Sequence, residues 1–562
     1  MQSHKILNIH PPQDKLKGIL SKELKISKIL AQILINRGIK TAQEAGEFLK
    51  INPKNLLDPY SFSQMHTAVN LIKKALKDKE KVMLCGDYDV DGVTSLALLK
   101  GIFSGFGLDT LHYIPHRVQD GYGLNKTAVQ LARQKKVKLL ITVDSGTTSF
   151  HEVEELRKSD IEVIITDHHE PAHDKLPNAS AIINPKIKGS AYKFKELAGV
   201  GVAYKLCQAL TGKVLAEELD LVALGTIADV VPLTGENRII AKLGLKQLSC
   251  TERIGIKSLI EASRLRAKEI NSTFVSFILG PRLNASGRMD TAEASLSLLL
   301  SQNKEEADLL AKSIDGLNRQ RQKIESGILE EAHDLISREV NFKDHKIIVV
   351  AKEGWHQGVL GIVASKLADK FSRPAIVISL TEELCKGSGR SIKNFHLFHA
   401  LRDCAEHLES FGGHSHAVGL LVSRDNIDNF KQEINRLAKE KLRVEDLLPS
   451  VDIDMELSLA DLSSSLAEEL QSLEPFGTGN REPLFYSRNL KLKGEPQVLS
   501  RDTLKFWVTD GVITYPVIGF GMASFKQSLL SAVSLDLVYL LKIDTWQGDE
   551  SIILEAKDIF FK

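Results

Sequence analysis

The sequence is poor in cysteine, and none of its five cysteines has a partner at Cys-x-x-Cys spacing. This scarcity argues against a structural zinc site or a disulfide framework and favours a reducing compartment. The chain also lacks an apolar run of about 18 residues, which excludes a transmembrane helix. Its N-terminus has no apolar core of signal-peptide length. We therefore expect a cytoplasmic protein that does not contact a membrane.

Net charge is scarce as well, at +1 for 562 residues. A balanced charge does not exclude a nucleic-acid enzyme, because such an enzyme needs only a local positive channel. With 43% hydrophobic and 26% charged residues, the composition is that of a soluble globular protein. The length exceeds one ordinary core, so we expect about three to four domains. Composition leaves the function open.

Hydrophobic patterning divides the first half of the chain into three segments. Residues 1–75 are expected to form a helical N-terminal segment. In residues 76–237, strand-like runs alternate with helical patterns, and these runs are KVMLC, KLLITV and EVIIT. This alternation predicts an α/β domain with a mostly parallel sheet covered by helices on both faces. Residues 238–340 are predicted to be a helical connection that ends in a long amphipathic helix.

The second half of the chain contains two segments with different hydrophobic patterns. Residues 341–445 contain the strand-like runs HKIIVVA and PAIVISL and are predicted to form a smaller α/β domain. Residues 446–562 consist of short alternating runs, which predict a small β-barrel.

Three aspartates follow the first strand-like run at alternate positions, and they are Asp87, Asp89 and Asp91 in KVMLCGDYDVDG. An apolar run that breaks into glycine and aspartate predicts a buried strand that leads into a loop. Three carboxylates this close repel one another unless cations lie between them. Taken alone, the segment is either a polar turn or a cation site.

Further acids and histidines follow other apolar runs. Asp144 follows LLITV, the pair His168 and His169 follows EVIIT with Asp167, and Asp229 lies in VALGTIADVVPL. Each alone has an ordinary explanation as a turn, a surface loop or a capping acid. Ligands of an open parallel sheet bind outside the carboxyl ends of its strands, so we expect these side chains to converge there. Their joint occurrence favours a metal site.

The candidate ligands are mostly carboxylates, with one or two imidazoles and no thiolate. Hard oxygen ligands suit Mg²⁺ and Mn²⁺, an added imidazole favours Mn²⁺, and structural zinc fits poorly. Five or six carboxylates exceed the need of one divalent ion. We therefore expect two ions, an arrangement that suits phosphoester hydrolysis.

Four motifs, GDYDVDG, VDSG, TDHH and GTIADVVPL, resemble in this order the motifs of the DHH phosphoesterase family. The resemblance implies metal ligands at Asp87 or Asp89, Asp91, Asp144, His168 and Asp229. It also implies that Asp144 bridges two ions and that His169 faces the scissile phosphate as a hydrogen-bond donor or general acid. Asp167 would orient its neighbours.

Two glycine-rich segments follow in the second half, and GGHSHAVG resembles the glycine-rich motif of the DHHA1 domain found in part of this family. Its Gly412 and Gly413 would let backbone N–H groups approach a phosphate, and His414 adds a donor. KGSGRS offers Ser388 and Arg390 in the same way. Either segment alone could be an ordinary turn, but together they predict an anion-binding cleft that faces the metal site.

Longer segments resemble the bacterial single-strand-specific 5′→3′ DNA exonucleases of this family, and they are YIPHRVQDGYGLN, LGPRLNASGRMDTA, EGWHQGVLGIVASKL and LEPFGTGNREPLF. The resemblance implies that Arg117 joins Ser388 and Arg390 in a pocket for the 5′-phosphate, which a guanidinium binds bidentately. It implies a C-terminal OB-fold. It also leads us to expect that the further C-terminal domain of some members is missing.

A second set of residues is expected in a small-residue loop before a helix, where it would line the channel near the metals: Arg282, Asn284 and Arg288. The alternative for the two arginines is an interdomain ion pair. In the C-terminal barrel, the candidates for stacking on bases, or else for the core, are Phe506, Trp507 and Phe520.

The sequence thus predicts a two-metal exonuclease that releases 5′-mononucleotides from single-stranded DNA in repair and recombination. It is expected to act as a monomer, with a single-strand-binding protein and a helicase as candidate partners. One alternative is a phosphodiesterase of short oligonucleotides or cyclic dinucleotides, which typically lacks the barrel and the helical connection. The other is a non-catalytic replisome scaffold, a class that usually loses its metal-binding acids.

Overall fold

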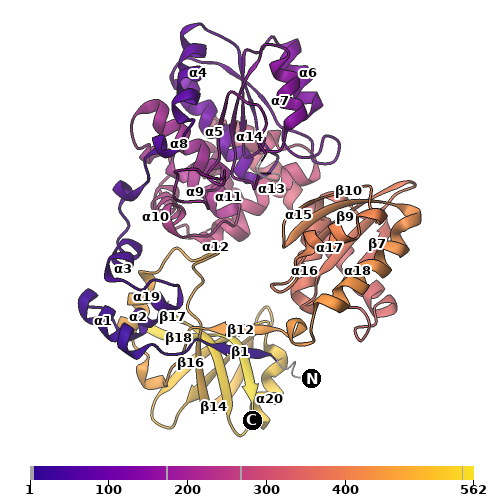
Figure 1. Cartoon of the computed structure of the whole chain (residues 1–562). Coiled ribbons are helices and arrows are strands. Elements are labelled where there is room, and N and C mark those ends of the chain that lie inside the picture. The colour runs from indigo at the N-terminus through magenta and orange to yellow at the C-terminus, as the bar shows by residue number, and fades with distance from the viewer. Residues whose placement is uncertain (1–4, 172–174, 266–268, 547–548) are drawn as a thin grey trace.

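A computed structural model describes residues 5–171, 175–265, 269–546 and 549–562. Figure 1 shows an α/β unit in purple and magenta, a second α/β unit in orange and a β-rich C-terminal unit in yellow. The first described residues lie beside the C-terminal unit, which also contains the C-terminus (Figure 1). In the described part of the chain, no helix is both long and apolar enough to cross a membrane.

The first α/β unit contains the predicted parallel sheet, with strand order β3-β2-β4-β5-β6. Its strands are β2 (Val82–Cys85), β3 (Thr110–Tyr113), β4 (Leu139–Val143), β5 (Glu162–Thr166) and β6 (Ala181–Ile183). Side chains of β2 alternate between two cores: Val82 and Leu84 pack in one, Met83 and Cys85 in the other. The sheet is therefore buried on both faces, as parallel sheets require.

Helices cover each face of this sheet. One core contains side chains of α4 (Met65–Lys77), α5 (Val90–Gly105) and α8 (Gly199–Thr211). The opposite core contains side chains of α6 (Lys126–Gln134) and α7 (Phe150–Arg157). The apolar runs of the sequence thus correspond to strands, and the amphipathic runs between them to the covering helices.

Helices follow that extend the first unit, because side chains from each of them pack in or against its core: α9 (Leu219–Ala228), α10 (Gly235–Ser249), α11 (Ile254–Ala262), α12 (Ser272–Phe274), the π-helical turn η4 (Val275–Leu279), α13 (Gly280–Met289), α14 (Glu293–Leu300) and α15 (Lys304–Glu339). The first half of α15 packs in the core of the first unit through Ala307 and Ile314. Its second half packs against the second unit through Ile328 and Ile336. A single helix therefore joins the two units.

The second unit has a mixed sheet with strand order β10-β11-β9-β8-β7. Its strands are β7 (Ile348–Glu353), β8 (Ala375–Leu380), β9 (Leu384–Arg390), β10 (Ser410–Gly413) and β11 (Ala417–Ser423). Its helices are α16 (Leu360–Phe371), α17 (Leu397–Asp403) and α18 (Ile427–Lys441). The glycine-rich segment KGSGRS is not a turn, because its residues 386–390 lie in β9. The GGHSHAVG segment spans the β10–β11 hairpin.

The C-terminal unit is a six-stranded sheet with strand order β13-β14-β15-β16-β18-β17. An additional pairing of β14 with β17 partly closes it into the predicted OB-like barrel. Its elements are β13 (Met455–Glu456), α19 (Ser464–Gln471), β14 (Phe485–Leu499), β15 (Thr503–Thr509), β16 (Thr514–Phe520), α20 (Lys526–Ser531), β17 (Leu535–Trp546) and β18 (Asp549–Phe561).

The first part of the N-terminal segment, residues 6–49, belongs structurally to the C-terminal unit, whereas α4 packs in the core of the first unit. This first part contains α1 (Asp14–Leu24), α2 (Lys28–Asn36) and α3 (Ala42–Leu49). Leu30 and Leu34 of α2 share a core with the barrel residues Phe485 and Leu537. The prediction of an entirely helical segment missed β1 (Ile6–Ile9), which pairs in parallel with β12 (Ser450–Ile453).

Candidate active site

Three neighbouring strands bring most of the predicted ligands together at their carboxyl ends. Asp87 follows β2, and Asp89 is the N-cap of the next helix, α5. Asp144 directly follows β4, and His168 lies just after β5. The carboxyl ends of parallel strands lie at one edge of the sheet, so these side chains converge.

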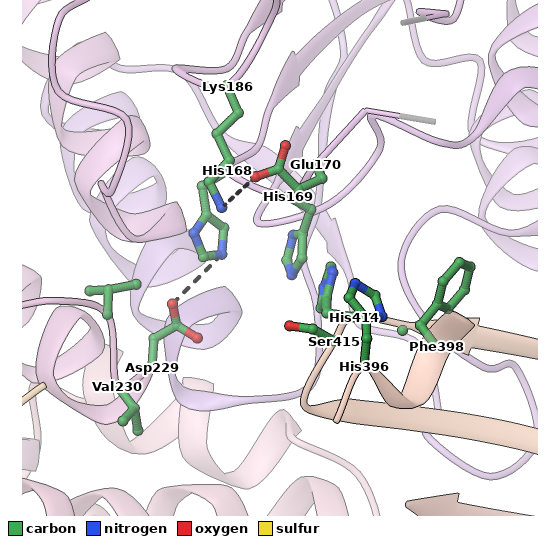
Figure 2. A pocket seen from close by; sticks show the side chains of 12 residues that line it. His168, His169, Glu170, Lys186, Asp229, Val230, His396, Phe398, His414 and Ser415 are labelled. Atoms are coloured by element: carbon green, nitrogen blue, oxygen red, sulfur yellow. Dashed lines mark ion pairs between the residues drawn. The ribbon is translucent and has the colours of Figure 1, made fainter. Parts of the chain in front are cut away.

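Asp229 belongs to the same cluster but comes from a helix end rather than from a strand end. We expected it at a strand end, but it is the C-cap of helix α9. The run VALGTIA was ambiguous, because a short segment that is apolar all round fits a buried helix as well as a buried strand. The side chain of Asp229 is still directed toward His168 (Figure 2).

His168 lies among the carboxylates. Its Nε2 is 3.1 Å from Asp144 Oδ1, 3.6 Å from Asp229 Oδ2 and 3.8 Å from Asp91 Oδ2. Three groups of potential metal ligands have their ligand atoms within 4.8 Å of one another: Asp91, His168 and Asp229; Asp144, His168 and His169; Asp87, Asp89 and Asp144. Every predicted metal ligand therefore belongs to one contiguous cluster.

Two helix N-termini fix the centre of this cluster. Asp91 lies in the first turn of α5, and its two carboxylate oxygens accept hydrogen bonds from the backbone N–H groups of Gly199 (2.6 Å) and Val200 (2.7 Å) at the start of α8. Gly199 also lets Asp144 lie close to the start of α8, because a Cβ on Gly199 would lie 2.7 Å from Asp144 Cβ. Asp144 has a left-handed backbone conformation (φ 57°), which aspartate tolerates better than most residues.

Asp167 orients the histidine pair through hydrogen bonds to the backbone of both residues and to the His169 ring. Its carboxylate accepts hydrogen bonds from the backbone N–H groups of Thr147 (2.9 Å), His168 (2.7 Å) and His169 (3.0 Å). It also lies 2.8 Å from His169 Nδ1. Burial tends to raise the pKa of Asp167, but the hydrogen bond and charge of His169 lower it far below its usual range. Asp167 is therefore an anion that fixes the His169 ring.

The electrostatics of the cluster call for a cation. Burial and the neighbouring Asp89 raise the pKa of Asp91 to about 7, and burial and Asp91 raise the pKa values of Asp144 and Asp229 well above their usual range. Burial lowers the pKa of His168 to about 3, so this imidazole is neutral. Asp144 Oδ1 and His168 Nε2 are buried without a hydrogen-bond partner among the described residues. Hard divalent cations fit these orphaned donor atoms.

Arg117, Arg288 and Arg390 form a positively charged group near the carboxylates, which we call the arginine pocket. The Arg117 guanidinium lies 4.7 Å from the centre of the Tyr88 ring. A Cβ on Gly361, in the first turn of α16, would lie 3.1 Å from both Ser388 Oγ and Arg390 Nη2, so these two side chains converge there. Burial and the charge of Arg117 both lower the pKa of Arg390. The three predicted 5′-phosphate residues thus lie near one another, with Ser388 and Arg390 on β9 and Arg117 in the segment between β3 and α6.

Arg288 adds to this pocket. It donates from Nη1 to the Gly358 carbonyl (3.3 Å). Burial, together with the charges of Arg117 and Arg321, lowers its pKa to about 9. Several guanidinium groups held close together without enough carboxylates bind an anion well.

Two other predicted channel residues have different surroundings. Arg282 pairs with Asp315 of α15 (3.0 Å) and donates to the Ile278 carbonyl (2.8 Å). The side-chain oxygen of Asn284 accepts from the backbone N–H of Val90 (3.2 Å) and so supports the start of α5. The prediction that Arg282, Asn284 and Arg288 lie in a loop was wrong, since all three are in helix α13.

A cavity of about 620 Å³ lies between the cluster of carboxylates and histidines and the β10–β11 hairpin. His414 lines it from the hairpin, and its ring stacks on His169 at 6.2 Å, as Figure 2 shows. Gly413 also lines the cavity and has a positive φ of 128°. Gly412 is not among the lining residues.

Comparisons with known proteins match each of the three units. Residues 81–226 match the family model of the DHH family, N-terminal domain, residues 344–440 match the DHHA1 domain, and residues 453–558 match the RecJ OB domain. The single-stranded-DNA-specific exonuclease RecJ of Bacillus subtilis (strain 168) is 39% identical over 551 residues, which span 98% of this chain and 70% of that protein. The RecJ of Escherichia coli (strain K12) is 37% identical over 81% of this chain and 82% of that protein. The chain belongs to the RecJ family.

Solved structures of RecJ share the fold. The RecJ of Thermus thermophilus in complex with Mn²⁺ aligns with a TM-score of 0.84 at 27% identity, over 100% of this chain and 80% of that chain. The same protein in complex with Mg²⁺ aligns with a TM-score of 0.77 at 26% identity, over 100% and 79% of the two chains. The matches extend over all three units of this RecJ family member.

Sequence reasoning missed several residues of this RecJ-family site. The Tyr122 hydroxyl donates to the Asp144 carbonyl (2.6 Å) and lies 3.1 Å from His169 Nδ1. Lys186 lines the cavity and pairs with Glu170 at 3.5 Å (Figure 2). Tyr122 lies five residues after Arg117 in the quoted YIPHRVQDGYGLN segment. Lys186 had no signal in the sequence, because nothing in INPKI distinguishes it from a surface lysine.

Proposed function

We propose that this RecJ-family protein is an exonuclease that degrades single-stranded DNA in the 5′→3′ direction and releases 5′-mononucleotides. One observation carries the proposal: the arginine pocket directly adjoins the carboxylate cluster. Burial raises the pKa of Asp87, and the nearby charge of Arg117 acts in the opposite direction. Burial lowers the pKa of Arg288, and the charge of Asp89 opposes that shift. The arginines and the carboxylates are therefore close enough for their charges to interact. A terminal phosphate in the pocket would place the next phosphate at the metals.

Two divalent ions, Mn²⁺ or Mg²⁺, would be held by Asp87 or Asp89 together with Asp91, Asp144, His168 and Asp229. When bound, the ions would acidify the attacking water and stabilise the charge on the phosphate oxygens. Asp144 and His168 each lie in two of the three ligand groups, and Asp144, as a carboxylate with two oxygens, is the one that could contact both ions. The orphaned Asp144 Oδ1 and His168 Nε2 support a cation at this place.

The remaining residues would position the strand. Water adds to the phosphorus that links the first two nucleotides, and the bond from phosphorus to the 3′ oxygen of the first nucleotide breaks. His169, whose Nδ1 is held by Asp167, would hydrogen-bond the scissile phosphate or pass a proton to the leaving oxygen. The shortened strand then carries a new 5′-phosphate, which can enter the pocket in the next cycle.

The long single strand would continue toward the OB-like barrel. Phe506 is fully buried, so it belongs to the core. Trp507 is half-buried with the Lys505 ammonium 5.5 Å from its ring centre, and Phe520 is 62% exposed. Aromatic and basic side chains on one sheet face suit a single strand. A single-strand-binding protein and a helicase are proposed partners of a monomeric, cytoplasmic enzyme.

Digestion of an internally labelled, 5′-phosphorylated single strand in Mn²⁺ tests the proposal. We expect 5′-mononucleotides from the 5′ end and little product from a blunt duplex. Asp144→Asn should remove hydrolysis and keep strand binding, whereas Asp109→Asn, at an exposed acid, should match wild type. Release from the 3′ end or equal digestion of duplex would contradict the proposal. Digestion of only di- and trinucleotides would favour the short-oligonucleotide phosphodiesterase instead.

A further inference from the structure

Val230, directly after Asp229, has a strained backbone. Its φ of 64° lies in the left-handed region, and its side chain is 63% exposed beside the cavity (Figure 2). A β-branched residue is a genuine outlier in this conformation. Such strain persists only where the surrounding structure fixes the chain on both sides. On one side the fixed element is helix α9, which ends at Ala228.

On the other side, the fixed element comes from the far end of the sequence. The backbone N–H of Leu233 donates to the Thr478 carbonyl (2.7 Å). Gly479 (φ 72°) lies against Pro232, with 3.1 Å between Pro232 Cβ and the position of an added Cβ. Gly477 approaches Leu233 so closely that an added Cβ would lie 2.7 Å from Leu233 Cδ1. Residues 472–480, which precede β14, thus dock on the turn that presents Asp229.

Hydrogen bonds within this docking segment hold its shape. Gly477 and Asn480 exchange two backbone hydrogen bonds of 2.9 and 3.1 Å. The fully buried Asn480 side chain donates to the carbonyls of Leu473 and Pro475, both at 2.8 Å. A loop that satisfies its own backbone groups in this way can hold a neighbouring strained turn.

Arg238 of α10 locks the segment to the first unit. It is 2% exposed and donates to the carbonyls of Leu473 (2.7 Å), Ser472 (3.0 Å) and Phe48 (2.9 Å). Its guanidinium also lies 3.9 Å from the centre of the Phe48 ring. All three hydrogen bonds end on backbone carbonyls rather than on a carboxylate. Arg238 therefore fixes the positions of these backbone segments relative to one another.

We propose that Arg238 and residues 472–480 are positioning elements for Asp229. They hold the strained turn at Val230 and thereby hold the Asp229 carboxylate in the metal cluster. The inference rests on the proposed metal site. It makes the affinity of that site for a divalent ion depend on the chain that leads into the C-terminal barrel.

Direct Mn²⁺ binding to the full-length protein, measured by electron paramagnetic resonance of the free ion, tests this. Arg238→Met removes the three hydrogen bonds, and we expect it to weaken Mn²⁺ binding about tenfold, as for other supports of metal ligands. Adding Val230→Gly should restore most of the affinity, because glycine adopts the left-handed conformation without strain. A purely structural role for Arg238 would not give this rescue.

Arg253→Met is the matched control. Arg253 is also held inside the first unit, by Asp220 and Glu218, and it has no hydrogen bond or ion pair with residues 472–480 in the described structure. This variant should lower the melting temperature and bind Mn²⁺ as wild type does. If Arg238→Met does not fold, Gly479→Ala, which strains the docking segment directly, takes its place in the same measurement.

The outcomes separate the two proposals. A folded Arg238→Met or Gly479→Ala protein with wild-type Mn²⁺ affinity overturns this inference, as does weakening that Val230→Gly fails to relieve. A wild-type protein that binds Mn²⁺ but hydrolyses no single-stranded DNA contradicts the proposed function alone.

Discussion

The adjacent histidines His168 and His169 have pKa values that their surroundings shift in opposite directions. Burial lowers the pKa of His168 to about 3, so His168 offers a neutral lone pair to the cluster. Burial lowers the pKa of His169 as well, but the hydrogen bond and charge of Asp167 outweigh it and leave that pKa above its ordinary value. A neighbouring pair whose pKa values are driven apart is suited to separate roles, which supports the proposed roles of His168 as a metal ligand and His169 as a proton donor.

At the residue scale, Arg390→Ala should reduce the preference for a 5′-phosphorylated end about tenfold. Arg390 donates only to the adjacent Gly389 carbonyl (2.9 Å) among the described hydrogen bonds, so its other donors remain for a phosphate. A hydrogen bond to a charged group contributes about 1.5–3 kcal/mol, which is tenfold or more. The measurement is the ratio of hydrolysis rates for 5′-phosphorylated and 5′-hydroxyl strands.

Arg282→Ala is the control, because Arg282 is occupied by Asp315. It should lower thermal stability and leave the ratio unchanged. An unchanged ratio in Arg390→Ala, or an equal fall in both variants, would contradict the pocket.

At the element scale, glycines explain two of the errors in secondary-structure prediction, those at GPRLNASGRM and at KGSGRS. The small residues of GPRLNASGRM indicated a loop, but Gly287 lies where an added Cβ would be 2.3 Å from the Tyr88 carbonyl oxygen, so it permits close helix packing. Gly387 and Gly389 in β9 likewise lie against Leu420 and Val418. A glycine in a sequence can indicate either a turn or a place where two elements pack closely. Only the elements that lie next to it in the fold distinguish these two cases.

Gly199→Ala tests the contact between α8 and the cluster. Its Cβ would lie 2.7 Å from Asp144 Oδ1, and overpacking of this kind typically costs about 1–3 kcal/mol. We expect a lower melting temperature and hydrolysis reduced at least about tenfold, because Asp144 must move. Gly101→Ala in α5, with no atom within 4 Å of the added Cβ, should be fully active and slightly more stable. Equal activity of the two variants would argue against a tightly packed Asp144.

At the scale of the whole molecule, the barrel presents a basic and aromatic face. Lys493 is directly opposite Trp507 in the sheet, and Phe520 is opposite Thr503 on the same face. This face would hold the strand far from the metals. Such contacts contribute to binding of long strands without changing the chemistry of the terminal phosphate.

Trp507→Ala should therefore weaken binding of a long single strand by about 1–3 kcal/mol, the usual contribution of one stacked base. Hydrolysis of a 5′-phosphorylated dinucleotide should not change, because that substrate is too short to reach the barrel. Phe106→Ala, which removes a 48% exposed ring at the end of α5, is the control. Anisotropy with a fluorescent strand gives the affinities. Equal loss on long and short substrates would contradict this role of the barrel.

The sequence alone determined the parallel sheet, the order of the units and the residue types of the cluster, because hydrophobic periodicity and local motifs depend on neighbouring residues. The tertiary structure alone decided the positions of Asp229 at a helix end, Arg282 in an ion pair and Phe506 in the core. It also brought residues 472–480 against the turn after Asp229. These features depend on contacts between residues tens to hundreds of positions apart, which no local pattern records.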